Sequence, residues 1–209
     1  MADKPNLDRA YAVGSTDDIK SLYRDWAETY DEAFVTAKGY RLAELVADAF
    51  VAAGGTGPVL DVGAGTGAVA AHLGKADISP IDALDLSQEM LDVARDKGLY
   101  RDLVAANVLE PLGPALPRRY NGIVSAGTFT HGHVGPDGIE NLLDIARPRA
   151  LFALSINAAH FAAKGFEAAF EQLADRISDV SAPELPIYDD RADPEHRGDT
   201  ARIVTFRLR

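Results

Sequence analysis

The chain has 209 residues, of which 47% are hydrophobic, 21 are Lys or Arg and 32 are Asp or Glu, so its net charge is −11. This length and composition are typical of one globular domain whose core needs no disulfide. The absence of Cys excludes disulfides, Cys-based zinc or iron–sulfur sites and thiol nucleophiles. The acidic balance repels phosphate backbones and anionic lipid, so we predict no nucleic-acid partner and no membrane partner.

The N-terminal part divides into two segments. Residues 1–18 are polar and acidic and lack the apolar run of a signal peptide, so we expect a flexible arm and a cytoplasmic location. From Ile19 onward, apolar side chains recur at helical spacing, and a second amphipathic stretch stops at Gly54 and Gly55. Two helices are therefore predicted before the first strand.

Strands and helices then alternate. Strand-like runs are expected at residues 58–62, 81–84, 103–106, 122–126 and 150–156, and helices at 68–74, 87–95 and 138–146. This alternation predicts an α/β fold with a mostly parallel, doubly wound sheet. A helix over 161–177 and a Pro- and Asp-rich loop over 182–200 precede the final run, 201–209. That run alternates apolar and basic side chains, so we predict an antiparallel edge strand with one face in water.

A glycine-rich turn follows the first strand. Gly63, Gly65 and Gly67 lie between that strand and the next helix, where a ligand can approach the backbone closely. Asp61 just before them would repel a pyrophosphate and favour a cationic ligand, although it could also cap the helix. Asp85 ends the second strand, 18 residues after Gly67, where an acid binds both hydroxyls of a ribose. The pattern indicates a nucleoside-type cofactor, and its spacing also satisfies the looser dinucleotide fingerprint of NAD enzymes.

Three sequence blocks carry a resemblance to one family. VLDVGAGTG resembles the first motif of class I S-adenosylmethionine-dependent methyltransferases, LDLSQEMLDVAR their second, and NVLEPL the segment that flanks adenine. Within this family the chain is most similar to small-molecule enzymes and to the methyltransferase-like proteins of the Williams–Beuren region. One departure is Pro148-Arg149-Ala150, where the family usually has Pro-Gly-Gly.

The resemblance implies a Rossmann-like sheet of seven strands with an antiparallel C-terminal strand, in one domain over 19–209 with a helical lid over about 19–54. It implies S-adenosylmethionine as the cofactor. The implied cofactor-binding residues are Tyr30, Asp61, Gly63, Ala64, Gly65, Thr66, Gly67, Asp85, Leu86, Ser87, Met90, Asn107, Val108 and Ala126. Asn107 and Val108 could instead be plain loop residues. Tyr30 could face a sulfonium through a cation–π contact or could pack in the core.

The expected reaction is an in-line methyl transfer to a small-molecule acceptor, in which alignment and desolvation supply most of the catalysis. His131 and His133 follow the fourth strand, where the acceptor is expected, and are candidate general bases or else polar loop residues. No third ligand accompanies this pair at an informative spacing, so no metal site is predicted. The alternatives are an NAD-dependent oxidoreductase and a non-catalytic S-adenosylmethionine-binding module. We expect a monomer or a homodimer.

Overall fold

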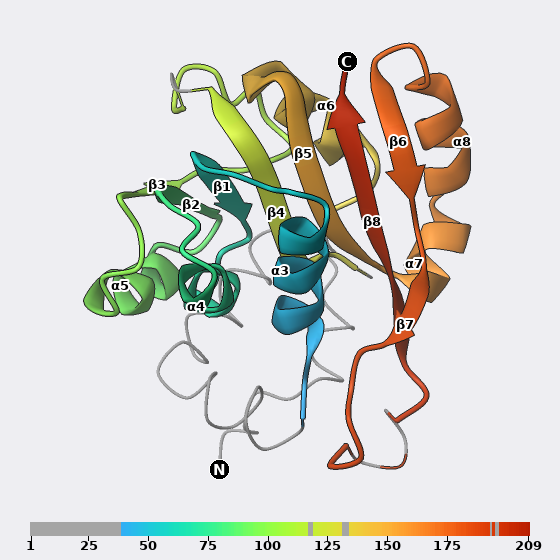
Figure 1. Cartoon of the computed structure of the whole chain (residues 1–209), viewed down its shortest axis with the longest axis horizontal. Helices are drawn as coiled ribbons and strands as arrows, with labels where there is room; N and C mark the ends of the chain where they lie inside the picture. Colours follow the sequence, from blue (N-terminus) through green and yellow to red (C-terminus); the bar gives the residue numbers. More distant parts are fainter. Residues whose placement is uncertain (1–38, 117–118, 131–133, 193, 195–196) are drawn as a thin grey trace.

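The computed structural model describes residues 39–116, 119–130, 134–192, 194 and 197–209. This part of the chain forms an eight-stranded sheet with helices on both faces (Figure 1). The helices are α3 (Leu42–Ala52), α4 (Ala68–Lys75), α5 (Gln88–Asp96), α6 (Asp137–Ile145), α7 (Ala158–Ala163) and α8 (Phe166–Gln172). The strands are β1 (Val59–Val62), β2 (Ile81–Asp85), β3 (Asp102–Ala105), β4 (Tyr120–Phe129), β5 (Ala146–Asn157), β6 (Ile177–Ser181), β7 (Glu184–Pro186) and β8 (Thr200–Leu208).

The two faces of the sheet carry separate apolar layers. The α3, α4 and α5 helices pack on one face, where Phe50, Leu73 and Leu91 are completely buried. The α6 and α8 helices pack on the other face, where Phe152 stacks on Phe206 from the neighbouring strand. Covering on both faces explains why β1 is buried at every position and reads as an apolar run interrupted only by Asp61.

The strand order is β3-β2-β1-β4-β5-β8-β6, with β7 also paired to β8. The first five strands are parallel, and β8 runs antiparallel to β5, β6 and β7. The predicted mostly parallel fold with an antiparallel C-terminal strand is thus confirmed, with eight strands where seven were expected. Because β1 lies between β2 and β4, the chain reverses direction of winding there, and parallel sheets of this kind bind ligands at such a point.

The prediction of an edge strand at the C-terminus is wrong, because β8 lies inside the sheet between β5 and β6. Residues expected to end a helix and to form a loop instead make β6 and β7, which pair with β8. The helix expected over 161–177 is interrupted at Gly165, whose φ of +69° leaves the helical region and separates α7 from α8. Periodicity alone did not reveal this break.

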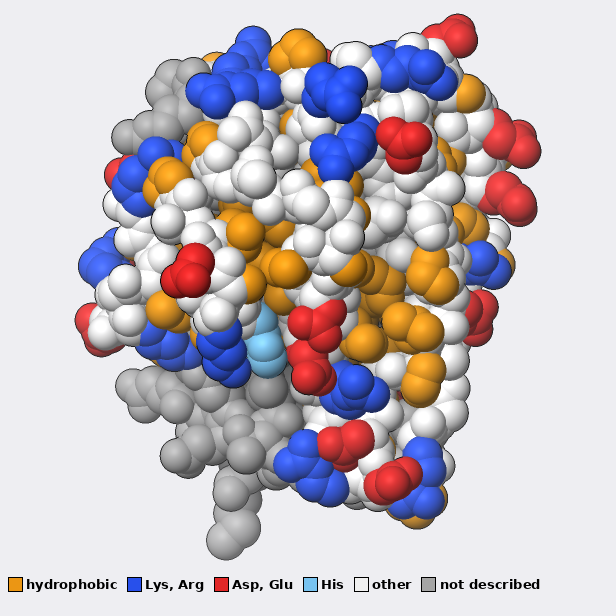
Figure 2. All heavy atoms as spheres, viewed as in Figure 1, with side chains coloured by type: hydrophobic (Ala, Val, Ile, Leu, Met, Phe, Trp, Pro, Cys, Tyr) orange, Lys and Arg blue, Asp and Glu red, His pale blue; other side chains and the backbone are white. Residues whose placement is uncertain are grey.

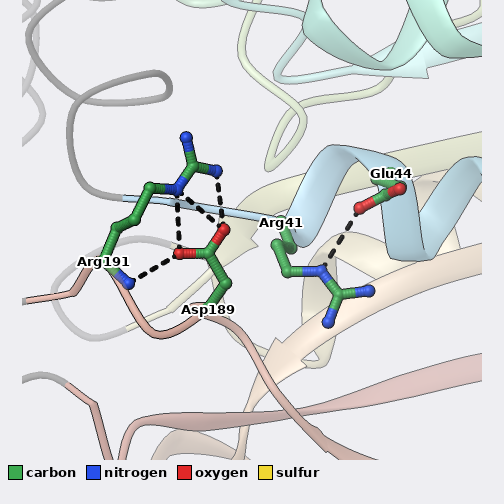
Figure 3. Close-up of polar contacts among 4 residues, drawn as sticks. All are labelled: Arg41, Glu44, Asp189 and Arg191. Atoms are coloured by element: carbon green, nitrogen blue, oxygen red, sulfur yellow. Dashed lines mark hydrogen bonds and ion pairs between the residues drawn. The ribbon is translucent and has the colours of Figure 1, made fainter.

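The stretch that leads into α3 lies beside the loop between β7 and β8, and Figure 3 shows Arg41 with Glu44 on one side and Asp189 with Arg191 on the other. Arg41 donates its backbone N–H to Ile187, and Asp189 donates its own to Gly39, at 2.9 and 3.0 Å. The Asp189 carboxylate accepts from the Arg191 side chain, which lowers the pKa of Asp189. A Cβ at Gly39 would collide with that carboxylate, so the close approach needs glycine. No helix in the described ranges is long and apolar enough to cross a bilayer.

Candidate functional site

The three glycines of the turn after β1 are needed for different reasons. All three have positive φ, of +65° at Gly63, +53° at Gly65 and +96° at Gly67. A Cβ at Gly63 would collide with the Thr128 hydroxyl, and one at Gly67 would come within 3.2 Å of the Tyr100 ring. A Cβ at Gly65 would meet no atom of the described residues within 4 Å. Packing therefore explains Gly63 and Gly67, whereas Gly65 borders open space that a ligand can occupy.

The turn is tied to the carboxyl end of β2. The N–H groups of Gly63 and Ala64 both donate to the Leu84 carbonyl, at 2.7 and 3.1 Å. The Gly65 N–H donates to Asp85 Oδ2 and the Ser87 N–H to Asp85 Oδ1, each at 2.8 Å. Burial raises the pKa of Asp85, and the N–H groups of Ser87, Gly65 and Leu86 lower it. Asp85 thus bridges the turn and the start of α5, and its side chain stays partly exposed to a ligand.

The carboxyl end of β1 is fixed to β4. The Val62 carbonyl accepts from the hydroxyls of Ser125 and Thr128, at 2.7 and 3.0 Å. The Gly127 N–H in turn donates to the Ser155 hydroxyl on β5 at 2.9 Å. These bonds hold three adjacent strand ends in register at the edge where the glycine turn begins.

Asp61 lies beneath the turn and has no exposed surface. Its Oδ2 accepts from the Tyr100 hydroxyl at 2.7 Å, and its Oδ1 has no hydrogen-bond partner within the described chain. Burial raises the pKa of Asp61 to about 7, the Tyr100 hydrogen bond lowers it, nearby Asp85 raises it, and the Ala70 N–H in the first turn of α4 lowers it. A buried carboxylate with an unsatisfied oxygen is costly, and an adjacent cation would stabilise its charged form.

The structure brings the residues predicted for cofactor binding to the carboxyl edge of β1, β2 and β4, in two groups. Those with side or main chain partly exposed there are Gly63, Gly65, Asp85, Leu86, Asn107 and Ala126. Those that are buried are Asp61, Ala64, Thr66, Gly67, Ser87, Met90 and Val108. The first group can touch a ligand, while the second supports it. Ser87, for example, accepts the Met90 N–H at 3.2 Å and caps α5. Tyr30, His131 and His133 lie outside the described residues.

Sequence reasoning missed Tyr100 and a second buried acid. Asp82, near the start of β2, is completely buried and accepts two bonds from the Arg101 guanidinium, at 2.8 and 2.6 Å. The Tyr120 hydroxyl donates to the same carboxylate at 3.0 Å. The adjacent Tyr100 and Arg101 thus serve two different buried aspartates. An acid inside an apolar strand was the available signal, because such a group needs a partner.

Among the residues that the structure describes, no group of three His, Asp or Glu side chains has the arrangement of a metal site. The site is instead built from backbone N–H groups, carboxylates and small residues at strand ends. This donor set suits a ligand with hydroxyls and a positive charge.

Residues 59–149 match a family described as "Methyltransferase domain". Human methyltransferase-like protein 27 is 31% identical over 139 residues, which cover 64% of this chain and 56% of that protein. The chain therefore spans little more than half the length of this curated relative.

Two solved structures have TM-scores of 0.67. The N-methyltransferase NodS from Bradyrhizobium japonicum, in complex with S-adenosyl-L-homocysteine, is 13% identical and covers 90% of this chain and 97% of its own. The [4+2]-cyclase SpnF is 14% identical, and the match covers 93% of this chain and 97% of the SpnF chain. At such identities the likeness concerns the fold alone. Residues 59–149 are therefore similar to a methyltransferase domain, and the chain as a whole has the Rossmann-like fold found in methyltransferases such as NodS.

Proposed function

We propose that this protein is an S-adenosylmethionine-dependent methyltransferase that methylates a small-molecule acceptor by in-line displacement. The observation that carries the proposal is Asp61, a completely buried carboxylate under the glycine turn, one of whose oxygens has no hydrogen-bond partner among the residues that the structure describes. A pyrophosphate would be repelled by this acid together with Asp85, whereas an ammonium or sulfonium would be attracted. The methyltransferase domain and the NodS complex support the same cofactor.

Each element of the turn has a role in this proposal. The cofactor supplies a methyl group on a positively charged sulfur, which makes the methyl carbon electrophilic. Asp85 accepts hydrogen bonds from ribose hydroxyls while it holds the Gly65 N–H. The open side of Gly65 admits the cofactor close to the backbone. Asn107, whose side chain accepts the Leu109 N–H at 3.0 Å, borders the adenine.

Alignment of the two reactants and exclusion of water then account for most of the rate. His131 and His133 stay candidate bases for an acceptor that must lose a proton. The helical lid over about 19–54, the cytoplasmic location and the monomeric or homodimeric state stay predictions.

A binding assay separates this proposal from an NAD-dependent enzyme. S-adenosylhomocysteine at 100 times its Kd should raise the free energy of unfolding by about 2.7 kcal/mol, and NADH should leave it unchanged. The opposite pattern would overturn the cofactor assignment. The Asp92→Ala variant, which loses an exposed acid on α5, serves as a control and should be stabilised by S-adenosylhomocysteine as much as the wild type.

A second assay tests catalysis. Protein incubated with S-adenosylmethionine carrying a deuterated methyl group and a small-molecule extract should yield labelled products, detected by mass spectrometry. Cofactor binding without any labelled product would favour the non-catalytic module. The shared fold of a [4+2]-cyclase makes this test necessary, because fold alone does not determine the reaction.

A further inference from the structure

A polar hollow lies at the opposite end of the sheet from the glycine turn, where β4 and β5 begin and β8 ends. Its volume is about 210 Å³. The side chains that line it include those of Thr56, Asn121, Arg149 and Arg207. Figure 2 shows Lys and Arg side chains gathered along this edge of the molecule, although the chain as a whole carries a net charge of −11.

The hollow is formed by an irregularity in β5. Tyr120 on β4 pairs with Ala146 on β5, and the next pair is Gly122 with Leu151. The chain advances two residues on β4 but five on β5 between these pairs, so β5 carries three extra residues. In this bulge Arg147, Pro148 and Arg149 are exposed. Bulges of this kind redirect side chains out of the sheet.

Arg149 occupies a backbone conformation that an arginine rarely adopts, with φ of +68°. The other non-glycine residues with positive φ in the described chain are Asp77 and Asp179, and aspartate tolerates this region better. Glycine would relieve the strain at position 149. An arginine kept at a strained position beside a hollow indicates a use for its guanidinium group.

Within the described residues, no carboxylate pairs with the guanidinium groups of Arg147, Arg149 and Arg207. The Arg207 guanidinium donates to the carbonyls of Ala53 and Arg149, at 2.6 and 3.2 Å. That of Arg147 donates to the Asn121 side-chain oxygen at 3.2 Å. Arg149 and Arg207 line the hollow, and Arg147 contacts its lining residue Asn121, so the three guanidinium groups produce a local positive potential.

We propose that this hollow binds the phosphate group of a small anionic molecule. Guanidinium groups pair with phosphate through two parallel charge-assisted hydrogen bonds, and Arg149 is exposed and available for such a pair. The hollow is smaller than the roughly 300 Å³ at which pockets for drug-sized ligands begin, so it suits one phosphate group rather than a nucleotide. The acidic remainder of the surface disfavours a nucleic acid.

Calorimetric titration of the full chain with inorganic phosphate tests the proposal. Phosphate should bind with millimolar or tighter affinity, while sodium acetate and sodium chloride at equal ionic strength should not bind. Equal heats from all three salts would overturn the proposal, and so would binding of a DNA duplex without binding of phosphate. A second titration with glycerol 2-phosphate shows whether the hollow prefers a free phosphate ion or a phosphate ester. Binding of either form supports the proposed site, and the tighter one identifies the preferred ligand.

Variants at position 149 give the decisive comparison. Arg149→Gly should weaken phosphate binding about tenfold or more, because a charge-assisted pair is lost, while its Tm without phosphate stays equal or rises as the strain is relieved. Arg149→Lys keeps the charge and should retain part of the affinity. Lys164→Gln removes an exposed charge at α7, at the far end of the sheet, and should leave phosphate affinity unchanged. Unaltered binding by Arg149→Gly would exclude the hollow as the phosphate site.

Discussion

The Tyr100 hydroxyl donates a 2.7 Å hydrogen bond to the buried Asp61 carboxylate, across 39 positions of the chain. The bond joins the loop before β3 to the middle of the sheet, directly beneath the glycine turn. The aromatic ring of Tyr100 also lies against Gly67, where a Cβ would come within 3.2 Å of it. Tyr100 therefore contacts both the Asp61 carboxylate and the glycine turn.

We predict that Tyr100→Phe weakens S-adenosylhomocysteine binding about tenfold at neutral pH, because one hydrogen bond to a buried carboxylate is lost. The same change removes a contact that lowers the pKa of Asp61, so that pKa rises above about 7. Cofactor affinity should increase as Asp61 ionises, and the pH midpoint of this increase should move upward in the variant. Titration calorimetry across pH 6–9 measures both effects.

The matched control is Tyr120→Phe, which also removes a hydroxyl bonded to a buried aspartate, Asp82, but at the other end of β2. It should lower the free energy of unfolding and leave cofactor affinity unchanged. If Tyr100→Phe and Tyr120→Phe have the same pH midpoint for cofactor binding, then Tyr100 does not lower the pKa of Asp61.

Asp61 should also make the stability of the cofactor-free protein depend on pH. Its pKa in the folded state is about 7, above the ordinary value of 3.8, so the folded protein holds a proton that the unfolded chain releases earlier. The stabilisation is complete below pH 3.8 and is lost as the pH rises through 7, by a total of roughly 4 kcal/mol.

The Asp61→Asn variant has no titratable carboxyl group at position 61, so its free energy of unfolding should not fall in this way as the pH rises through 7. Denaturant unfolding at pH 5 and pH 8 should therefore show the wild type losing about 2.6 kcal/mol more than the variant between the two values. The comparison isolates Asp61, because all other groups are shared. Parallel curves for the two proteins would contradict the raised pKa of Asp61.

The glycine turn and Asp85 were predictable from sequence because their chemistry is local: a strand, a turn of small residues and an acid at the end of the next strand. The partnership of Tyr100 with Asp61 was not, because no local pattern links residues so far apart in the chain. The β6 and β7 strands were missed for a different reason. Their Pro- and Asp-containing sequence is typical of a loop, and only pairing with β8 makes them strands.

Asp85→Ala should weaken S-adenosylhomocysteine binding at least 100-fold, a few kcal/mol, because charge-assisted bonds to the ribose hydroxyls are lost. It should also lower the free energy of unfolding by about 2 kcal/mol, because the Gly65 and Ser87 N–H groups lose their acceptor. Isothermal calorimetry and denaturant unfolding measure the two losses separately. Unchanged affinity would refute the ribose assignment.

Alanine at Gly63 and at Gly65 should have contrasting effects. At Gly63 the new methyl group collides with Thr128, whose hydroxyl holds the end of β1, so the variant should unfold at lower temperature or fail to fold. At Gly65 the methyl group meets no atom of the described part of the chain, so the positive φ should cost only about 1–2 kcal/mol. Gly65→Ala should nevertheless lose cofactor binding, as measured by calorimetry on the folded variant. Full affinity in Gly65→Ala would mean that the open space beside Gly65 is not where the cofactor lies.

Arg101→Met should lower the free energy of unfolding by about 3 kcal/mol, because the buried Asp82 carboxylate loses two of the hydrogen bonds that stabilise its charge. Arg95→Met on α5 is the control. It breaks an ion pair with Asp92 in which both side chains are 54% exposed, and such pairs contribute less than about 1 kcal/mol. Denaturant unfolding of both variants measures the difference. If the two substitutions cost the same, Asp82 is stabilised by Tyr120 rather than by Arg101, and Arg101→Met combined with Tyr120→Phe should then cost no more than Tyr120→Phe alone.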